Sequence, residues 1–293
     1  MTAAIVAGLY RHPIKGCRAV SVDVVDVTAT GIAGDRELAI IDEEGHPLDQ
    51  VRHPRLARIG VEILDDDHLR LSHPAAAPLV QRRAADGERV EVVATLDTAS
   101  AIDQGPDAAR WLSAVLQQPV RLVHVAEPWT RSLPLDQFAL IDGRSFDRFA
   151  SVAPILLNNQ ASLDDLNTRL DEPISMDRFR MNVVIDGLAA YEEDALTLLR
   201  GGQVVLERMT ACERCVVITT DQRTGKRPSG QVLEVLRDYR YKAEDRYTNG
   251  LVFGAYMAVR HPGTLRVGEG LEVERDPDFV SLVSPPGGSS ASG

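Results

Sequence analysis

Cysteine is scarce in this chain: there are three among 293 residues. So few thiols do not build the disulfide framework of a small secreted domain. No run approaches the roughly 20 apolar residues that a membrane-spanning helix needs, and Met1–Leu9 lacks the basic start and apolar core of a signal peptide. We therefore expect a cytoplasmic protein of a reducing compartment, with no membrane partner.

Positive charge is in deficit. The chain has 32 Lys and Arg against 43 Asp and Glu, which gives a net charge of −11. Such a chain repels nucleic acid and anionic membranes, so no nucleic-acid partner is expected, and any anionic ligand needs a local basic pocket. Three common motifs are also absent: the phosphate-binding GxxxxGK[ST], the dinucleotide-binding GxGxxG and the hydrolase GxSxG.

The first part of the chain predicts many short strands separated by glycines, which favours a barrel or a sandwich. Between Asp103 and Gln118 the pattern changes, because Ala109, Leu112 and Val115 recur at helical spacing. Strands are predicted at Ile5–Leu9, Val20–Ala29, Leu38–Ile41, Ala57–Leu64, Arg89–Ala94 and Val120–Val125.

The region from Glu127 to Phe149 is irregular and predicts a connection between two lobes, with Leu133, Leu135 and Phe138 buried. Helices are predicted to start at Ser162, from a capping-box-like pattern, and after Ser229. The segment from Ser284 to Gly293 holds only Pro, Gly and Ser apart from one alanine, which predicts disorder. Further strands are predicted at Asn182–Ile185, Gln203–Glu207, Cys215–Thr220, Val252–Val259 and Leu265–Val273.

Cys212 and Cys215 form a Cys-Glu-Arg-Cys unit that allows several kinds of chemistry. It could be half of a zinc site, although no second pair exists. It could be a redox pair, although the helix-starting context is missing, or simply two buried thiols. It could also present one thiolate, with its pKa lowered by Arg214, as a ligand for a soft metal. The spacing alone leaves these alternatives open.

Several basic residues lie in turns or at strand ends, where barrels present their ligand-binding side chains. Each one alone is typical of a solvated surface charge. Together they suit a ligand that carries phosphate, because guanidinium groups bind phosphate oxygens in pairs. The histidines, five of which precede proline, are interpreted as structural. The basic residues in question are Lys15, Arg18, Arg36, Arg178, Arg180 and Arg214.

The order of these segments resembles the MOSC-domain proteins, in particular the mitochondrial amidoxime-reducing component and its bacterial relatives. The resemblance runs from about Ile5 to Val273. The matching segments are Tyr10-x-x-Pro13-x-Lys15-Gly16-Cys17, Gly34-Asp35-Arg36, Asp103-Gln104-Gly105, Ala109-Arg110-Trp111-Leu112, Arg121-Leu122-Val123-His124, Ala161 to Asn167, Phe179-Arg180-Met181-Asn182-Val183-Val184-Ile185, Tyr191-Glu192-Glu193-Asp194, Cys212-Glu213-Arg214-Cys215, Phe253-Gly254-x-Tyr256 and Pro262 to Gly268.

This resemblance implies a mainly β fold with some helices, in two β-barrel-like parts. Residues 1–125 would form the MOSC N-terminal β-rich domain, residues 126–277 the MOSC domain with peripheral helices, and residues 278–293 a disordered tail. A molybdenum–molybdopterin cofactor would lie between the two parts, with molybdenum bound by Cys215. The cofactor contacts implied by the resemblance are Lys15, Arg36, Arg180, Asn182, Arg214 and Tyr256, and Asp194 is a candidate for orienting the catalytic site.

The chain departs from the family pattern beside the pterin phosphate. Gly16, Val152 and Ala153 stand where small hydroxyl residues are frequent, and Glu213 stands where serine is familiar. Contacts at these positions would come from backbone N–H groups. An inward-pointing Glu213 could repel the phosphate.

The resemblance implies an oxidoreductase that reduces small N-hydroxylated substrates, namely amidoximes, hydroxylamines or N-hydroxylated bases. No cysteine follows Cys215 to build an iron–sulfur cluster. Electrons are therefore expected from a separate ferredoxin-, flavodoxin- or cytochrome b5-like protein. The alternatives are a carrier of the cofactor or of sulfur without turnover, and a scaffold that has lost the cofactor.

Overall fold

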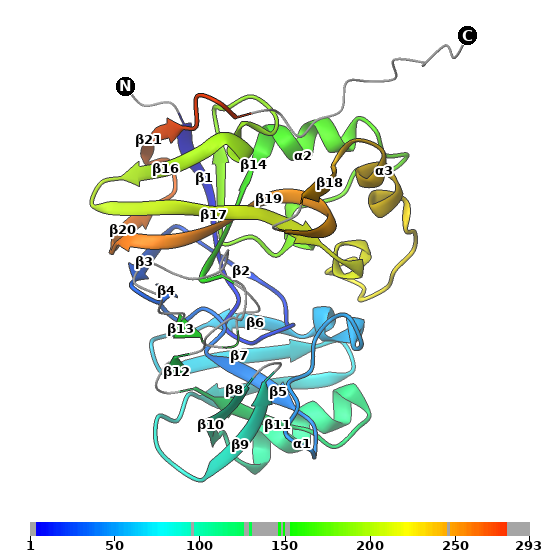
Figure 1. Cartoon of the computed structure of the whole chain (residues 1–293). Coiled ribbons are helices and arrows are strands. Elements are labelled where there is room, and N and C mark those ends of the chain that lie inside the picture. The colour runs from blue at the N-terminus through cyan, green and yellow to red at the C-terminus, as the bar shows by residue number, and fades with distance from the viewer. Residues whose placement is uncertain are drawn as a thin grey trace.

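The computed structural model describes residues 4–94, 97–125, 129–130, 146–147, 149, 153–244 and 247–279. They form two lobes, one above the other in Figure 1. The upper lobe is a closed seven-stranded barrel, and the lower lobe holds smaller sheets. None of the helices described is long and apolar enough to span a bilayer.

The barrel places the first strand of the chain among six strands from its second half. β14 (Ile155–Asn159) and β15 (Val183–Asp186) run parallel, and α2 (Gln160–Asn167) lies in the crossover between them. The ring closes where Ile155 pairs with Met257. The other barrel strands are β1 (Ala4–Arg11), β21 (Gly270–Arg275), β16 (Leu196–Gly201), β17 (Val204–Arg214) and β19 (Tyr247–His261), with β18 (Tyr241–Glu244) and β2 (Val20–Val22) attached at the edges.

Alternating side chains fill the barrel. In β1, Ala4 and Val6 are buried whereas Ile5 is exposed, as the period of a half-buried strand requires. Leu9 is buried as well, beyond the irregularity between Val6 and Gly8. Leu157, Leu206 and residues of the other strands complete this core. A three-stranded sheet of β20 (Gly263–Arg266), β3 (Val24–Thr28) and β4 (Gly31–Ile32) packs beside it.

The lower lobe has its own core. Its centre contains Leu38, Leu56, Leu112 and Leu122, all fully buried. One sheet is β5 (Leu38–Ile41), β11 (Arg121–His124), β10 (Asp97–Asp103) and β9 (Arg89–Ala94), and the other is β6 (Gly60–Ile63), β7 (His68–His73) and β8 (Ala76–Arg82). Helix α1 (Pro106–Leu116) and the 3-10 helix η1 (Pro54–Arg58) cover them, and β12 (Trp129–Thr130) pairs with β13 (Phe146–Asp147).

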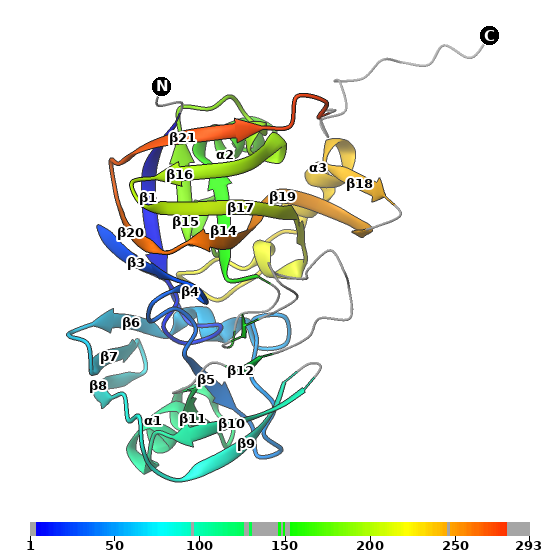
Figure 2. The same cartoon turned by 60° about the vertical axis from the view of Figure 1, so that its left-hand side comes forward.

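The expected fold class, mainly β with helices, is confirmed. The first strands of the chain belong to the upper lobe, because β1 pairs with β15 and β21, and β3 pairs with β20. In Figure 2 the first strands accordingly lie with the upper lobe. Leu133, Leu135, Phe138 and the tail from Ser284 lie outside the described residues.

Several predicted elements differ in detail. Residues 215–220 are not a strand, because η6 (Val216–Thr219) turns as a 3-10 helix directly after β17. Helix α2 starts before Ser162: the side chain of Asn159 caps it by accepting a bond from the amide of Ala161. The three predicted strands Val20–Ala29, Ala57–Leu64 and Leu265–Val273 are each interrupted, the second of them by η1. Helix α3 (Gln231–Tyr239) forms where predicted.

One buried ion pair lies behind the barrel wall. Arg240 binds both carboxylate oxygens of Asp194 at 2.6 and 3.1 Å, and the two side chains are 0% and 1% exposed. The guanidinium also lies 4.4 Å from the ring centroid of Tyr191. Because both charges are removed from water, removing either one would leave the other buried without a partner.

We predict that Arg240→Met lowers the free energy of unfolding by about 3–5 kcal/mol, because it leaves the Asp194 charge buried without a partner. Urea denaturation followed by circular dichroism measures the change. The double variant Asp194→Leu/Arg240→Met should recover most of the loss. A single variant that costs under about 1 kcal/mol would contradict the account.

Candidate functional site

A cavity of about 300 Å³ lies between the two lobes. Strand ends and turns from both lobes line it, which is where such folds place functional residues. It brings together twelve of the candidate residues from the sequence, although they are scattered over more than 240 positions. These are Lys15, Gly16, Arg36, Ala153, Arg178, Arg180, Asn182, Cys212, Glu213, Arg214, Cys215 and Tyr256.

Cys215 is the exposed thiol among the three cysteines, since Cys17 and Cys212 are buried. Burial raises the pKa of Cys17 to about 12 and also raises the pKa of Cys212. Both buried thiols are therefore held in the protonated form, which neither binds metal nor attacks substrate. Cys215 is exposed at the junction of β17 and η6, whereas Cys212, which also lines the cavity, is buried.

Lys15, Gly16 and Arg36 come to the cavity from the first part of the chain. Lys15 Nζ donates to the carbonyl of Phe149 at 3.1 Å. Gly16 has a φ of +79°, which favours glycine, and a Cβ there would lie 2.7 Å from Leu56. The turn therefore needs glycine, which accounts for this departure from the hydroxyl residues of the family pattern.

Arg36 links the two lobes at the cavity. It pairs with Asp35, donates to Asn182 Oδ1 at 3.1 Å, and donates to the carbonyl of Arg180 at 3.2 Å. Arg36 and Arg180 have φ values of 52° and 56°, in the left-handed region that non-glycine residues seldom adopt. Such conformations persist where surrounding contacts enforce them, and they concentrate at functional sites.

Arg180 and Asn182 lie immediately before β15. Arg180 Nη1 donates to the carbonyl of Cys17 at 2.9 Å. Burial and the nearby charge of Arg36 lower the pKa of Arg180 to about 10, so it keeps its charge at neutral pH. Asn182 is fully buried, and its amide donates to the carbonyl of Tyr10 at 3.2 Å. Both residues thus bind the first part of the chain as well as lining the cavity.

Arg214 is held rigidly from behind. It donates to the carbonyls of Phe253 at 2.8 Å and Phe179 at 2.9 Å, and its guanidinium lies 5.4 Å from the centroid of the Phe179 ring. Tyr256, on the adjacent β19, hydrogen-bonds the buried thiol of Cys212. These contacts fix the backbone that presents Cys215.

Glu213 is exposed, and its side chain lies over Gly250, where a Cβ would collide with the carboxylate. Gly250 therefore provides the space that a glutamate needs at this position. Glu213 also lines the cavity together with one other acid, Asp49. Against these two carboxylates stand the five cationic side chains of Lys15, Arg36, Arg178, Arg180 and Arg214. Two of the five are paired outside the cavity lining, Arg36 with Asp35 and Arg178 with Asp221 at 3.6 Å.

Two expected site residues are not placed in the cavity. Asp194 does not line it, and its carboxylate is bound by Arg240 in the barrel wall. Val152 lies outside the described residues, whereas its neighbour Ala153 lines the cavity.

The sequence did not reveal a pair of buried amides at the cavity, one of which, Gln50, lines it. Gln50 and Gln222 exchange hydrogen bonds of 2.9 Å in both directions. Gln50 also donates to the carbonyl of Gly16 at 2.7 Å, and Gln222 accepts from Arg180 at 3.4 Å. These residues are 172 positions apart, and neither stands in a recognisable motif, so only the fold shows the pairing.

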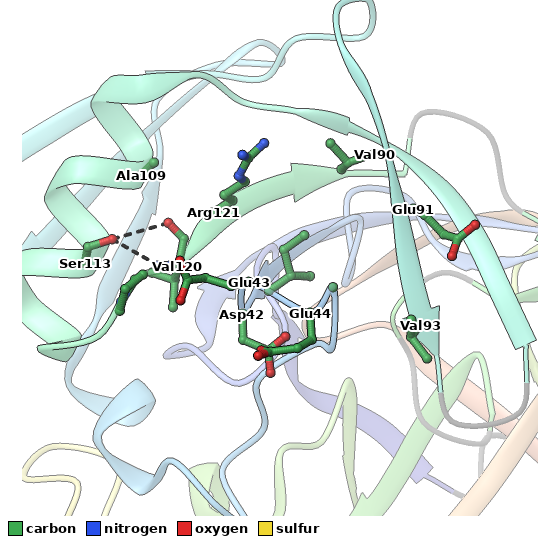
Figure 3. A pocket seen from close by; sticks show the side chains of 13 residues that line it. Asp42, Glu43, Glu44, Val90, Glu91, Val93, Ala109, Ser113, Val120 and Arg121 are labelled. Atoms are coloured by element: carbon green, nitrogen blue, oxygen red, sulfur yellow. Dashed lines mark hydrogen bonds between the residues drawn. The ribbon is translucent and has the colours of Figure 1, made fainter.

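A larger cavity of about 510 Å³ in the lower lobe has the opposite character (Figure 3). The carboxylates of Asp42, Glu43, Glu44 and Glu91 line it, with Arg121 as its one cation, and it contains no thiol. Arg121 is paired with Asp103 at 3.1 Å. This cavity is the larger of the two, but its charge opposes an anionic ligand, and none of the candidate cofactor or catalytic residues lines it.

The interlobe cavity suits a phosphate-bearing cofactor that carries a soft metal. Five cations can bind phosphate oxygens, and one accessible thiol can ligate a metal. The described residues contain no group of three or more His, Cys, Asp or Glu side chains placed to hold a metal ion. A metal bound through Cys215 would need further ligands from its own cofactor.

The comparisons with known proteins agree with this geometry. The MOSC N-terminal beta barrel domain matches residues 3–119, and the MOSC domain matches residues 147–272. Mitochondrial amidoxime-reducing component 1 of Mus musculus is 35% identical, with 90% of this chain and 80% of the relative covered. The human protein of the same name is 33% identical, with 90% and 81% covered.

Among solved structures, the YUAD protein from Bacillus subtilis matches 94% of this chain and 97% of its own, at 11% identity and a TM-score of 0.45. That likeness is too distant to carry an argument. The two matched domains and the identity to the amidoxime-reducing components show that the chain belongs to the MOSC-domain family, together with the mitochondrial amidoxime-reducing components.

Proposed function

We propose that this protein is a molybdenum-cofactor oxidoreductase that reduces N-hydroxylated compounds to the parent amidine, amine or base. The observation that carries the proposal is one accessible thiol, Cys215, at a cavity with five cationic side chains between two lobes. The relatives are named for the reduction of amidoximes.

The residues of the cavity divide the work of holding the cofactor. The thiolate of Cys215 would ligate molybdenum, and Lys15, Arg36, Arg180 and Arg214 would bind the pterin and its phosphate. The side chain of Asn182 forms hydrogen bonds with Arg36, Tyr10 and Leu156, so Asn182 acts by positioning Arg36. When bound, the cofactor supplies a reduced metal that can accept the oxygen of an N–O bond.

The overall reaction consumes two electrons and two protons for each substrate. In an amidoxime the N–O bond breaks, the nitrogen takes up hydrogen to give the amidine, and the oxygen leaves as water. The electrons would come from a separate ferredoxin-, flavodoxin- or cytochrome b5-like protein. The chain itself binds the substrate against the exposed face of the cavity and keeps Arg214 and Cys215 in place.

Turnover tests the proposal directly. Protein purified from a host that makes the cofactor should convert benzamidoxime to benzamidine when reduced methyl viologen supplies electrons. Product is measured by chromatography, beside protein from a host that lacks the cofactor. Molybdenum-loaded protein without turnover, but able to restore activity to a cofactor-free enzyme, would instead establish a carrier, for which an accessible thiol is also suited.

We predict that Cys215→Ala abolishes molybdenum binding and activity while the protein stays folded, because no other thiol is accessible. Cys212→Ala should keep most of both, since Cys212 is buried and protonated. Metal analysis and thermal unfolding measure the two effects. If Cys212 proves to be the essential thiol, the assignment of the ligand is wrong.

We predict that Arg180→Gln loses cofactor at least tenfold faster than the wild type, because one of five cations at the cavity is removed. The matched control is Arg18→Gln, a nearby arginine that donates to the carbonyl of Arg223 and does not line the cavity. Release is followed as pterin fluorescence after dilution. Equal release from both variants would contradict the role of Arg180.

A further inference from the structure

Four exposed cations form a patch beside the cavity. We call it the basic rim: Arg52, Arg55, Arg223 and Lys226. Arg52 directly follows Val51, which lines the cavity and is 44% exposed. Arg55 lies in η1 of the lower lobe, whereas Arg223 and Lys226 belong to the loop after η6.

Close packing joins the two segments that carry the basic rim. A Cβ on Gly225 would lie 3.1 Å from the carbonyl of Pro54 and 3.2 Å from the Cα of Arg55. Arg227, beside Lys226, donates to the carbonyl of Val51 at 3.0 Å. The four cations therefore lie on one continuous surface, and the cavity opens beside it.

The charges of the basic rim are available to a partner. Within the part of the chain that the structure describes, no hydrogen bond or ion pair is made by the side chains of Arg52, Arg223 and Lys226. The side chain of Arg55 makes one hydrogen bond, to the side-chain oxygen of Gln117 at 3.3 Å. Two acids of the same segments have other partners, and Asp221 also pairs with Arg178 at 3.6 Å. Asp49 accepts from the amide of Arg52, and Asp221 accepts from Arg223 and Thr224.

Such a concentration of positive charge is unexpected in a chain with a net charge of −11. An acidic protein repels another acidic protein over most of its surface. A local basic patch attracts the acidic partner and so fixes where it docks. Electron transfer becomes rapidly slower as donor and acceptor move apart, so a donor has to dock near the cavity. The basic rim is positioned for that purpose.

We infer that the basic rim is the docking surface for an acidic electron-donor protein. This inference rests on the proposed function. The donor delivers the two electrons of each turnover, singly or as a pair, and is itself oxidised by the same number. The two protons come from solvent, and the oxygen of the substrate leaves as water. No residue of the basic rim takes part in the chemistry.

The test is the charge-reversed variant R52E/R55E/R223E/K226E, loaded with cofactor. Turnover of benzamidoxime is measured with three acidic donors, namely a reduced flavodoxin, a [2Fe–2S] ferredoxin and cytochrome b5, and separately with reduced methyl viologen. With the donor that serves the wild type best, kcat/KM for the donor should fall by about 10- to 100-fold at low ionic strength. The loss should shrink in about 0.5 M salt, because salt screens the charges.

The matched control is R70E/R82E/R89E/R110E, which reverses four exposed arginines of the lower lobe away from the cavity. This control should retain donor-dependent turnover, and both variants should retain molybdenum and turnover with methyl viologen. Equal losses in the two variants, or no loss in either, would overturn the inference. So would wild-type turnover with methyl viologen but with none of the acidic donors. Absence of turnover with methyl viologen would instead refute the proposed function.

Discussion

The contact that the rest of this structure depends on is the guanidinium of Arg36, where the two lobes meet. Arg36 follows the strands at the start of the chain, yet it donates to the side chain of Asn182 and to the carbonyl of Arg180, about 145 positions further on. Arg180 in turn donates back to the carbonyl of Cys17. This exchange fixes the distance between the lobes, and therefore the cavity itself.

Both arginines adopt left-handed backbone conformations that cost free energy, on the order of 1 kcal/mol each. The exchange of hydrogen bonds offsets that cost only when both lobes are in place. The charged form of Arg180 is also destabilised, since burial and the neighbouring Arg36 lower its pKa to about 10. An anionic ligand would relieve the repulsion between these two cations. The charge thus favours an anionic ligand, and the strain is of the kind that concentrates at functional sites.

Much of this site could be predicted from the sequence, since the thiol, the turn at Lys15 and the segment from Phe179 to Ile185 stand in recognisable order. Sequence patterns were insufficient where contacts between distant segments determine the structure. Asp194 stands in a segment that matches the family, but only the fold shows Arg240 bound to it. Cys215 begins a 3-10 helix although the apolar run after it suggests a strand, because the chain must turn to present the thiol to the cavity.

Local sequence patterns also could not predict the division into lobes or the amide pair of Gln50 and Gln222. β1 pairs with β15 and β21, which are contributed by residues late in the chain, and no periodicity reports such a pairing. The residues of the basic rim likewise look like ordinary surface charges in the sequence. They become one surface only because the loop after η6 packs on η1.

X-ray absorption at the molybdenum edge is the most direct test of the central claim, that Cys215 binds the metal. The measurement compares cofactor-loaded wild type with Cys215→Ser and Cys212→Ser, where a hydroxyl replaces each thiol. The account predicts one sulfur fewer around molybdenum in Cys215→Ser and no change in Cys212→Ser. An unchanged sulfur count in Cys215→Ser, or a loss in Cys212→Ser, would contradict it.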